Sequence, residues 1–181
     1  MRRLSSTVVV VAGDGAADVV AGLSGLHNVR AIPRGERRPA EVMEIAARSA
    51  ATYVVHDADP LADVAAAWTA FFDGTGVTGA LEVAVEAALG ELRADRLTLP
   101  DYYLVLDPDG MPATVRHWWL GVLAGAAPAR VVPVQAGTVA QELGRLAAGR
   151  WWPADLEGWL RGLPRVVPDR AGLPGIGAVV A

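Results

Sequence analysis

The stretch TVVVVAGDGAADVVAGL, residues Thr7–Leu23, decides the fold. Its apolar run from Val8 to Ala12 predicts a buried strand, and the segment Ala16–Ser24 after it predicts a helix. A strand that turns directly into a helix is the first half of the crossover unit of parallel sheets. The turn itself, Gly13-Asp14-Gly15, could hold a phosphate or a metal ion, or it could be only the tight corner that such a crossover needs. The corner is the simpler interpretation.

The same alternation of short apolar runs and helical patterns continues along the chain. Runs rich in β-branched or aromatic residues predict five strands, at Thr7–Ala12, Val29–Ile32, Thr52–His56, Tyr102–Leu106 and Arg130–Val134. Helical patterns lie between and after them, at Ala16–Ser24, Pro39–Ala50, Ala62–Phe72, Gly79–Ala94, Pro112–Ala126, Val139–Ala147 and Ala154–Leu163. We therefore predict an α/β fold, a three-layer αβα sandwich with a mainly parallel five-stranded sheet of flavodoxin-like or Rossmann-like topology.

Details of the pattern place individual elements within this plan. The first and third strands are nearly all apolar, which is typical of central strands covered on both faces. Pro133 cannot donate a hydrogen bond to a neighbouring strand, so the fifth strand is expected at a sheet edge. The helix Gly79–Ala94 is an addition after the third strand. Residues 1–163 are predicted to form a single domain, and the proline- and glycine-rich residues 164–181 an extended or flexible tail.

The composition excludes several kinds of chemistry. The chain of 181 residues has no cysteine, and all 16 of its basic residues are arginine. Disulfides, cysteine-ligated metals, a phosphate-loop lysine and a lysine general base are therefore excluded. The net charge is −4 and the arginines are scattered, so we expect no nucleic-acid partner. No apolar run approaches the roughly 20 residues of a membrane span, so we expect a soluble, cytoplasmic protein without a membrane partner.

Acidic residues follow three of the predicted strands. Asp14 follows the first strand, Asp57 the third and Asp107 the fourth, with Asp59 and Asp109 close behind. Because the carboxyl ends of parallel strands share one edge, these carboxylates could form a ligand site or bind Mg²⁺. Turn formation and helix capping explain most of the same acids, but Asp57 has no such local explanation.

Two further residues complete the candidate acidic site. Arg34, after the second strand, could face an anionic ligand. His56, which stands beside Asp57, could act as a general base. His56 and Asp57 are therefore the candidate catalytic residues. A buried histidine at the end of a strand is the simpler interpretation of His56.

The order of elements over roughly residues 7–72 resembles the receiver domain of response regulators. Asp57 stands at the end of the third strand, where receivers carry the phosphorylated aspartate. The chain departs from that family elsewhere. It has one acid after the first strand where receivers have two, Asp107 in place of a hydroxyl residue, and no lysine after the fifth strand. The resemblance therefore implies the flavodoxin-like topology and leaves phosphotransfer in doubt.

Tryptophan is the other unusual feature. Four of the six tryptophans are neighbours, in Arg116-His117-Trp118-Trp119 and Arg150-Trp151-Trp152-Pro153. Neighbouring side chains on an α-helix point about 100° apart, so one surface can hardly bury a whole doublet. Exposed tryptophan beside arginine is typical of binding hot spots, which makes Arg116, Trp118, Trp151 and Trp152 candidate partner-binding residues. Alternatively, the doublets pack together in one core.

The two tryptophan segments also resemble small uncharacterised proteins that are encoded with bacterial conflict, or defence, systems. That resemblance implies an accessory or regulatory protein-binding module of a cytoplasmic bacterial system, without catalytic activity and without a required cofactor. The alternative is a metal-dependent phosphate-binding or phosphoryl-transfer enzyme that uses the acidic residues at the strand ends, with Mg²⁺ as its possible cofactor.

Overall fold

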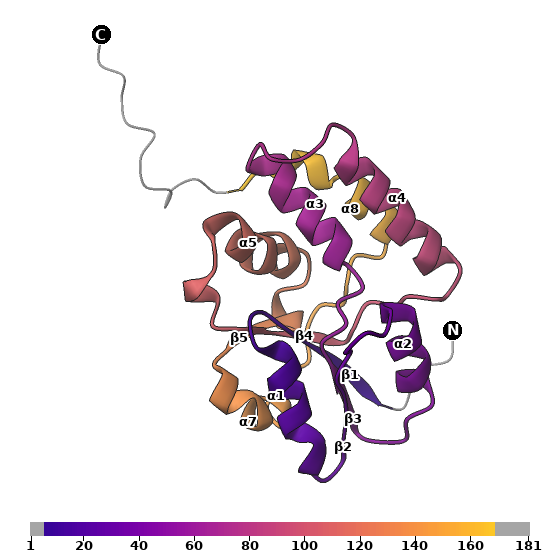
Figure 1. Cartoon of the computed structure of the whole chain (residues 1–181), viewed down its shortest axis with the longest axis vertical. Coiled ribbons are helices and arrows are strands. Elements are labelled where there is room, and N and C mark those ends of the chain that lie inside the picture. The colour runs from indigo at the N-terminus through magenta and orange to yellow at the C-terminus, as the bar shows by residue number, and fades with distance from the viewer. Residues whose placement is uncertain (1–5, 169–181) are drawn as a thin grey trace.

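The computed structural model describes residues 6–168, and its sheet confirms the predicted strands. The strands are β1 (Thr7–Ala12), β2 (Val29–Ile32), β3 (Tyr53–His56), β4 (Tyr102–Leu106) and β5 (Val131–Val134). All pairings are parallel, in the order β2-β3-β1-β4-β5 (Figure 1). β1 and β3 are internal, as their apolar sequences predict, and β5, which contains Pro133, is an edge strand.

Helices cover both faces of this sheet, which confirms the three-layer sandwich (Figure 1). One face is covered by α1 (Ala16–Gly22) and α7 (Val139–Leu143). The other carries α2 (Pro39–Ala47), α3 (Ala62–Phe72), the predicted additional helix α4 (Ala80–Arg93), α5 (Ala113–His117) and α8 (Leu156–Arg161). Alternate residues of β1 serve the two layers, because Val9 and Val11 pack with the α1 and α7 layer and Val10 packs with the other.

The strand order creates a switch point beside β1. The connection from β1 leads to α1 on one face, while the connection from the adjacent β3 leads to α3 on the opposite face. Two neighbouring strands whose connections diverge leave a crevice beyond their carboxyl ends, and ligands of open α/β sheets bind in such crevices. The crevice of this fold therefore lies between the residues that follow β1 and those that follow β3.

The C-terminal segment folds back and completes the core. The indole nitrogen of Trp152 donates a hydrogen bond to the carbonyl oxygen of Pro100 at 2.7 Å, and that of Trp68 donates to the carbonyl oxygen of Leu163 at 3.2 Å. Trp118 and Trp152 are 1% and 5% exposed. The prediction that these two tryptophans form a binding surface is therefore wrong. They share one core with Trp119, as the alternative proposed, whereas Trp151 remains 48% exposed.

A wide helical turn explains how both tryptophans of the first doublet are buried. The predicted helix Pro112–Ala126 is α5 followed by a π-helical segment, η3 (Trp118–Leu123), and by α6 (Ala124–Ala126). A π-turn spans more residues than an α-turn, because its hydrogen bonds join i to i+5. Neighbouring side chains then diverge less than they do on an α-helix, so both Trp118 and Trp119 reach the core.

The ends of the described chain differ slightly from the predicted domain. A short helical turn, η6 (Leu163–Arg165), follows α8, and Val166 still packs against the core. The remainder of the predicted tail, residues 169–181, lies outside the described residues, as do residues 1–5. Within residues 6–168, no helix is both long enough and apolar enough to cross a bilayer.

A substitution at Gly13 tests the tight corner after β1. Gly13 has φ +110°, and a Cβ atom there would lie 3.0 Å from the carbonyl oxygen of Leu106. We expect Gly13→Ala to lower the free energy of unfolding by about 1–3 kcal/mol in urea denaturation, because an alanine is strained in this conformation. The control is Gly22→Ala in α1, where the added methyl group meets open space and is expected to stabilise by about 0.4–1 kcal/mol. Equal effects of the two substitutions would contradict this account.

Candidate functional site

An open pocket of about 400 Å³ lies at the predicted crevice. Most of its wall is the end of β1 and the corner that follows it, residues 11–17. The remaining lining residues are Asp57 and Asp59, which follow β3, and Trp119, which comes from the π-helical segment. Three of the acids predicted to share this edge, Asp14, Asp57 and Asp59, therefore do line one cavity.

The corner Gly13-Asp14-Gly15 is built by backbone conformation and not by capping. Gly13 and Gly15 have φ values of +110° and +75°, which glycine adopts readily. No side chain caps α1, so helix capping does not explain Asp14. The carboxylate of Asp14 is exposed at the pocket and is left available for a ligand.

Asp57 joins the ends of two strands. Its Oδ1 accepts a hydrogen bond of 2.6 Å from the backbone N–H of Arg34, in the loop after β2. The guanidinium of Arg34 turns onto its own loop, where Nε donates to the carbonyl oxygen of Arg37 at 2.9 Å. Arg34 thus contacts Asp57 through its backbone, and its side chain is not part of the pocket wall.

Asp59 is the most strongly perturbed acid of the pocket. Its Oδ1 accepts hydrogen bonds from the backbone N–H of Leu61 and from the hydroxyl of Tyr103, both at 2.9 Å. Part of the residue reaches solvent at the pocket, but its carboxyl group is buried, and this burial raises its pKa to about 6. Burial also raises the pKa of Tyr103, so the phenol stays protonated and donates to Asp59.

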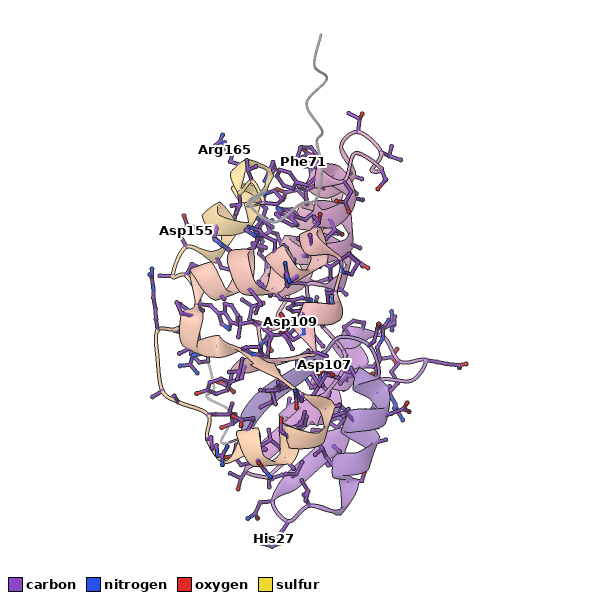
Figure 2. The ribbon with its side chains drawn as sticks, turned by 90° about the vertical axis from the view of Figure 1, so that its left-hand side faces the viewer. His27, Phe71, Asp107, Asp109, Asp155 and Arg165 are labelled. Carbon is purple, nitrogen blue, oxygen red and sulfur yellow. The ribbon has the colours of Figure 1, made fainter. Side chains whose placement is uncertain are left out.

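The acids that follow β4 do not join this group. Asp107 is exposed, has φ +43°, and leads into a short helical turn, η2 (Pro108–Gly110). Asp109 is fully exposed, 4.0 Å from Arg116 (Figure 2). Neither lines the pocket, and within residues 6–168 no three His, Cys, Asp or Glu side chains are placed to hold a metal ion. The prediction that Asp14, Asp57 and Asp107 form an Mg²⁺ site is therefore corrected, because Asp107 does not line the pocket that the other two share and the described residues contain no such group of three ligands.

His56 is a core residue at the end of β3. In the register of the sheet it pairs with Val10 of β1 and Ile32 of β2. The side chain is completely buried, and neither ring nitrogen has a hydrogen-bond partner. Burial lowers the pKa of the imidazole to about 4, so the ring is neutral at pH 7. It does not line the pocket, which agrees with the simpler interpretation of a buried strand-end histidine.

Comparisons with known proteins gave no match to a family model, to a curated protein or to a solved structure. The chemistry of the pocket must therefore be argued from its own residues.

Sequence reasoning missed two components of the pocket. Asp59 was predicted only as a supporting acid. Its carboxyl group accepts a hydrogen bond from Tyr103, which lies 44 positions away in the chain, and the local sequence does not show that contact. Trp119 is a core residue that also borders the pocket, and its place there depends on the π-helical segment, which an α-helical repeat does not predict. With Asp59 and Trp119 included, the lining of the pocket has three carboxylates and one aromatic ring. None of its lining residues has a basic side chain.

Proposed function

We propose that the chain is an accessory or regulatory protein-binding module, and that its pocket accepts a positively charged side chain of a partner protein. A single observation carries this proposal, namely that Asp14, Asp57 and Asp59 line one open pocket that contains no basic side chain among its described lining residues.

Electrostatics favour a cation over the other ligand classes. Asp59, with a pKa of about 6, is mostly ionised at pH 7, so it adds to the negative charge of the pocket. An ammonium or guanidinium group relieves the mutual repulsion of the acids and can lie against the indole of Trp119. A guanidinium also presents several N–H donors to neighbouring carboxylates.

A second candidate function is an enzyme that uses Asp59 as a general base. The observation that favours it is the pKa of about 6, since a base works best when its pKa lies near the working pH. Phosphoryl transfer is the less favoured chemistry, because three carboxylates repel a phosphate unless a cation neutralises them. A binding module requires no such additional group.

Asp14 provides the direct test of the binding proposal. We expect the blocked amino acid N-acetylarginine amide to bind the protein measurably by isothermal titration or by NMR shifts. Asp14→Asn is expected to weaken this binding by up to about fivefold, which corresponds to an exposed ion pair of up to about 1 kcal/mol. Asp14 caps nothing, so the substitution should leave the fold intact.

Asp18→Asn is the matched control. It removes the same charge four residues away, from an exposed position of α1 that does not line the pocket. Equal weakening by both substitutions would show that only the general negative charge matters. Stabilisation of the protein by Mg²⁺ with phosphate, and none by the arginine derivative, would instead support the enzyme.

A further inference from the structure

A loop with two arginines borders the acidic pocket. It joins β2 to α2, and its residue Arg34 donates a backbone hydrogen bond of 2.6 Å to Asp57, which lines the pocket. The strands β2 and β3 are parallel neighbours, so the loop after β2 leaves the sheet at the same edge as the acids that follow β3. Positive charge therefore lies next to a pocket whose own lining is negative.

A tight turn, Arg34-Gly35-Glu36-Arg37, holds both arginines in place. The backbone N–H of Arg37 donates to the carbonyl oxygen of Arg34 at 3.1 Å, and Gly35 has φ +55°. The side chains brace the same turn, because Nε of Arg34 donates to the carbonyl oxygen of Arg37 at 2.9 Å and Nη1 of Arg37 donates to that of Pro33 at 3.0 Å. Side chains that are already fixed lose less conformational entropy when they bind a ligand.

The two guanidinium groups keep most of their capacity to bind an anion. Neither forms an ion pair with an acid of residues 6–168. Each has five side-chain N–H donors, and the turn uses one of them in each case. Glu36 is exposed in the same turn, so Arg34, Glu36 and Arg37 together carry a net charge of +1. A planar guanidinium suits a carboxylate, because the two can share parallel hydrogen bonds.

The next residue, Arg38, already has its acid. Its Nε donates to Glu41 at 2.9 Å, and this hydrogen bond lowers the pKa of Glu41. The charge of Arg37 adds to the lowering. Within the described part of the chain, Arg38 is thus paired, whereas Arg34 and Arg37 are left for an acid from another molecule.

We propose that Arg34 and Arg37 bind a carboxylate of the same partner segment whose basic side chain enters the pocket. This inference rests on the proposed function and specifies the partner: a segment with an arginine or lysine and, two residues away, an aspartate or glutamate. In an extended peptide, side chains two residues apart lie on one face, roughly 7 Å from each other. The basic side chain also offsets the repulsion between the partner's carboxylate and the acids of the pocket, so the two charges act together.

Tripeptides that differ in one side-chain charge give the test with the full-length protein. Acetyl-Arg-Gly-Glu amide is compared with acetyl-Arg-Gly-Gln amide by NMR titration, and the reversed sequences Glu-Gly-Arg and Gln-Gly-Arg are compared in the same way. We expect the glutamate peptide to bind about two- to fivefold more tightly than its glutamine counterpart in one of the two orders, as for an exposed ion pair.

Variants of the turn locate this preference. Arg37→Gln, and independently Arg34→Gln, should reduce the preference for glutamate, because each removes one guanidinium and keeps the backbone hydrogen bond to Asp57. Arg30→Gln is the matched control, since it removes the same charge from an exposed position of β2, four residues before Arg34. It should leave the preference unchanged. Urea denaturation checks that each variant remains folded.

Three results would overturn the proposal. Equal binding of the glutamate and glutamine peptides in both orders would do so and leave the cation pocket standing, because every peptide still carries arginine. A preference for glutamate that survives both Arg34→Gln and Arg37→Gln, or that Arg30→Gln reduces equally, would place the carboxylate elsewhere. Absence of binding by all four peptides would overturn the proposed function together with this inference.

Discussion

Replacing Trp68 with alanine is expected to lower the free energy of unfolding by about 3–5 kcal/mol, measured by urea denaturation. Trp68 is completely buried, and its ring centroid lies 4.7 Å from that of Phe72 and 5.7 Å from that of Trp118. The substitution removes these contacts together with the hydrogen bond to Leu163. Alanine would leave a large cavity where α3 meets the C-terminal segment, and this cavity is the main cause of the loss.

Two control variants separate the components of this effect. Trp68→Phe keeps an aromatic ring but leaves the carbonyl oxygen of Leu163 without its donor, so we expect a smaller loss of about 1–3 kcal/mol. Trp151→Ala removes an indole that is 48% exposed and stacks on the guanidinium of Arg130 at 4.5 Å. That change should cost only about 1 kcal/mol. Equal losses for Trp68→Ala and Trp151→Ala would contradict the assignment of Trp68 to the core.

Between pH 4 and pH 6.5, His56 and Asp59 are expected to change the stability in opposite directions. The pKa of His56 is about 4 in the folded protein and 6.5 as an unperturbed group, so the unfolded chain binds more protons in this range. The contribution of His56 to the free energy of unfolding therefore falls as the pH falls. Asp59 has a folded pKa of about 6 against an unperturbed 3.8, so here the folded protein binds more protons and gains stability as the pH falls.

A shift of one pKa unit between the unfolded and the folded protein corresponds to about 1.36 kcal/mol of stability. The contributions of His56 and Asp59 to the free energy of unfolding are therefore similar in size, at about 3 kcal/mol each across the full pH range. We therefore expect the unfolding free energy of the unsubstituted protein to change little between pH 6.5 and pH 4.5. His56→Leu should gain about 2 kcal/mol over the same change, and Asp59→Asn should lose about 2 kcal/mol. Urea denaturation at both pH values measures all three proteins, and parallel profiles would contradict this account.

The sequence predicts the sheet well because each strand is a short apolar run that must be covered by helices. Thr7–Ala12 and Tyr102–Leu106 have the same bounds in the sequence prediction and in the structure. Pro133 correctly places β5 at an edge. The order of the strands could not be predicted, because helical crossovers of similar length can reach a neighbouring position or skip one.

The candidate site is less predictable because it depends on that order and on local backbone turns. Asp14 and Asp57 meet because β1 and β3 are neighbours. Asp107 follows β4, which is also a neighbour of β1, yet Asp107 does not line the pocket. A place at the carboxyl edge of a neighbouring strand is therefore not enough to put an acid in the pocket, and the local sequence Asp-Pro-Asp-Gly does not show how its loop turns.

The core depends on residues 152–163, which lie late in the chain, and this affects how the protein folds during synthesis. Translation delivers the five strands first, but Trp152, Leu160 and Leu163 belong to the same buried cluster as Val10 and Tyr103. A ribosome adds roughly 5–20 residues per second. The strands are therefore synthesised before the apolar side chains of Trp152, Leu160 and Leu163 are available to pack on them. Until that segment emerges, one face of the sheet is incompletely covered, and this interval is when the growing chain is most prone to aggregate or to require a chaperone.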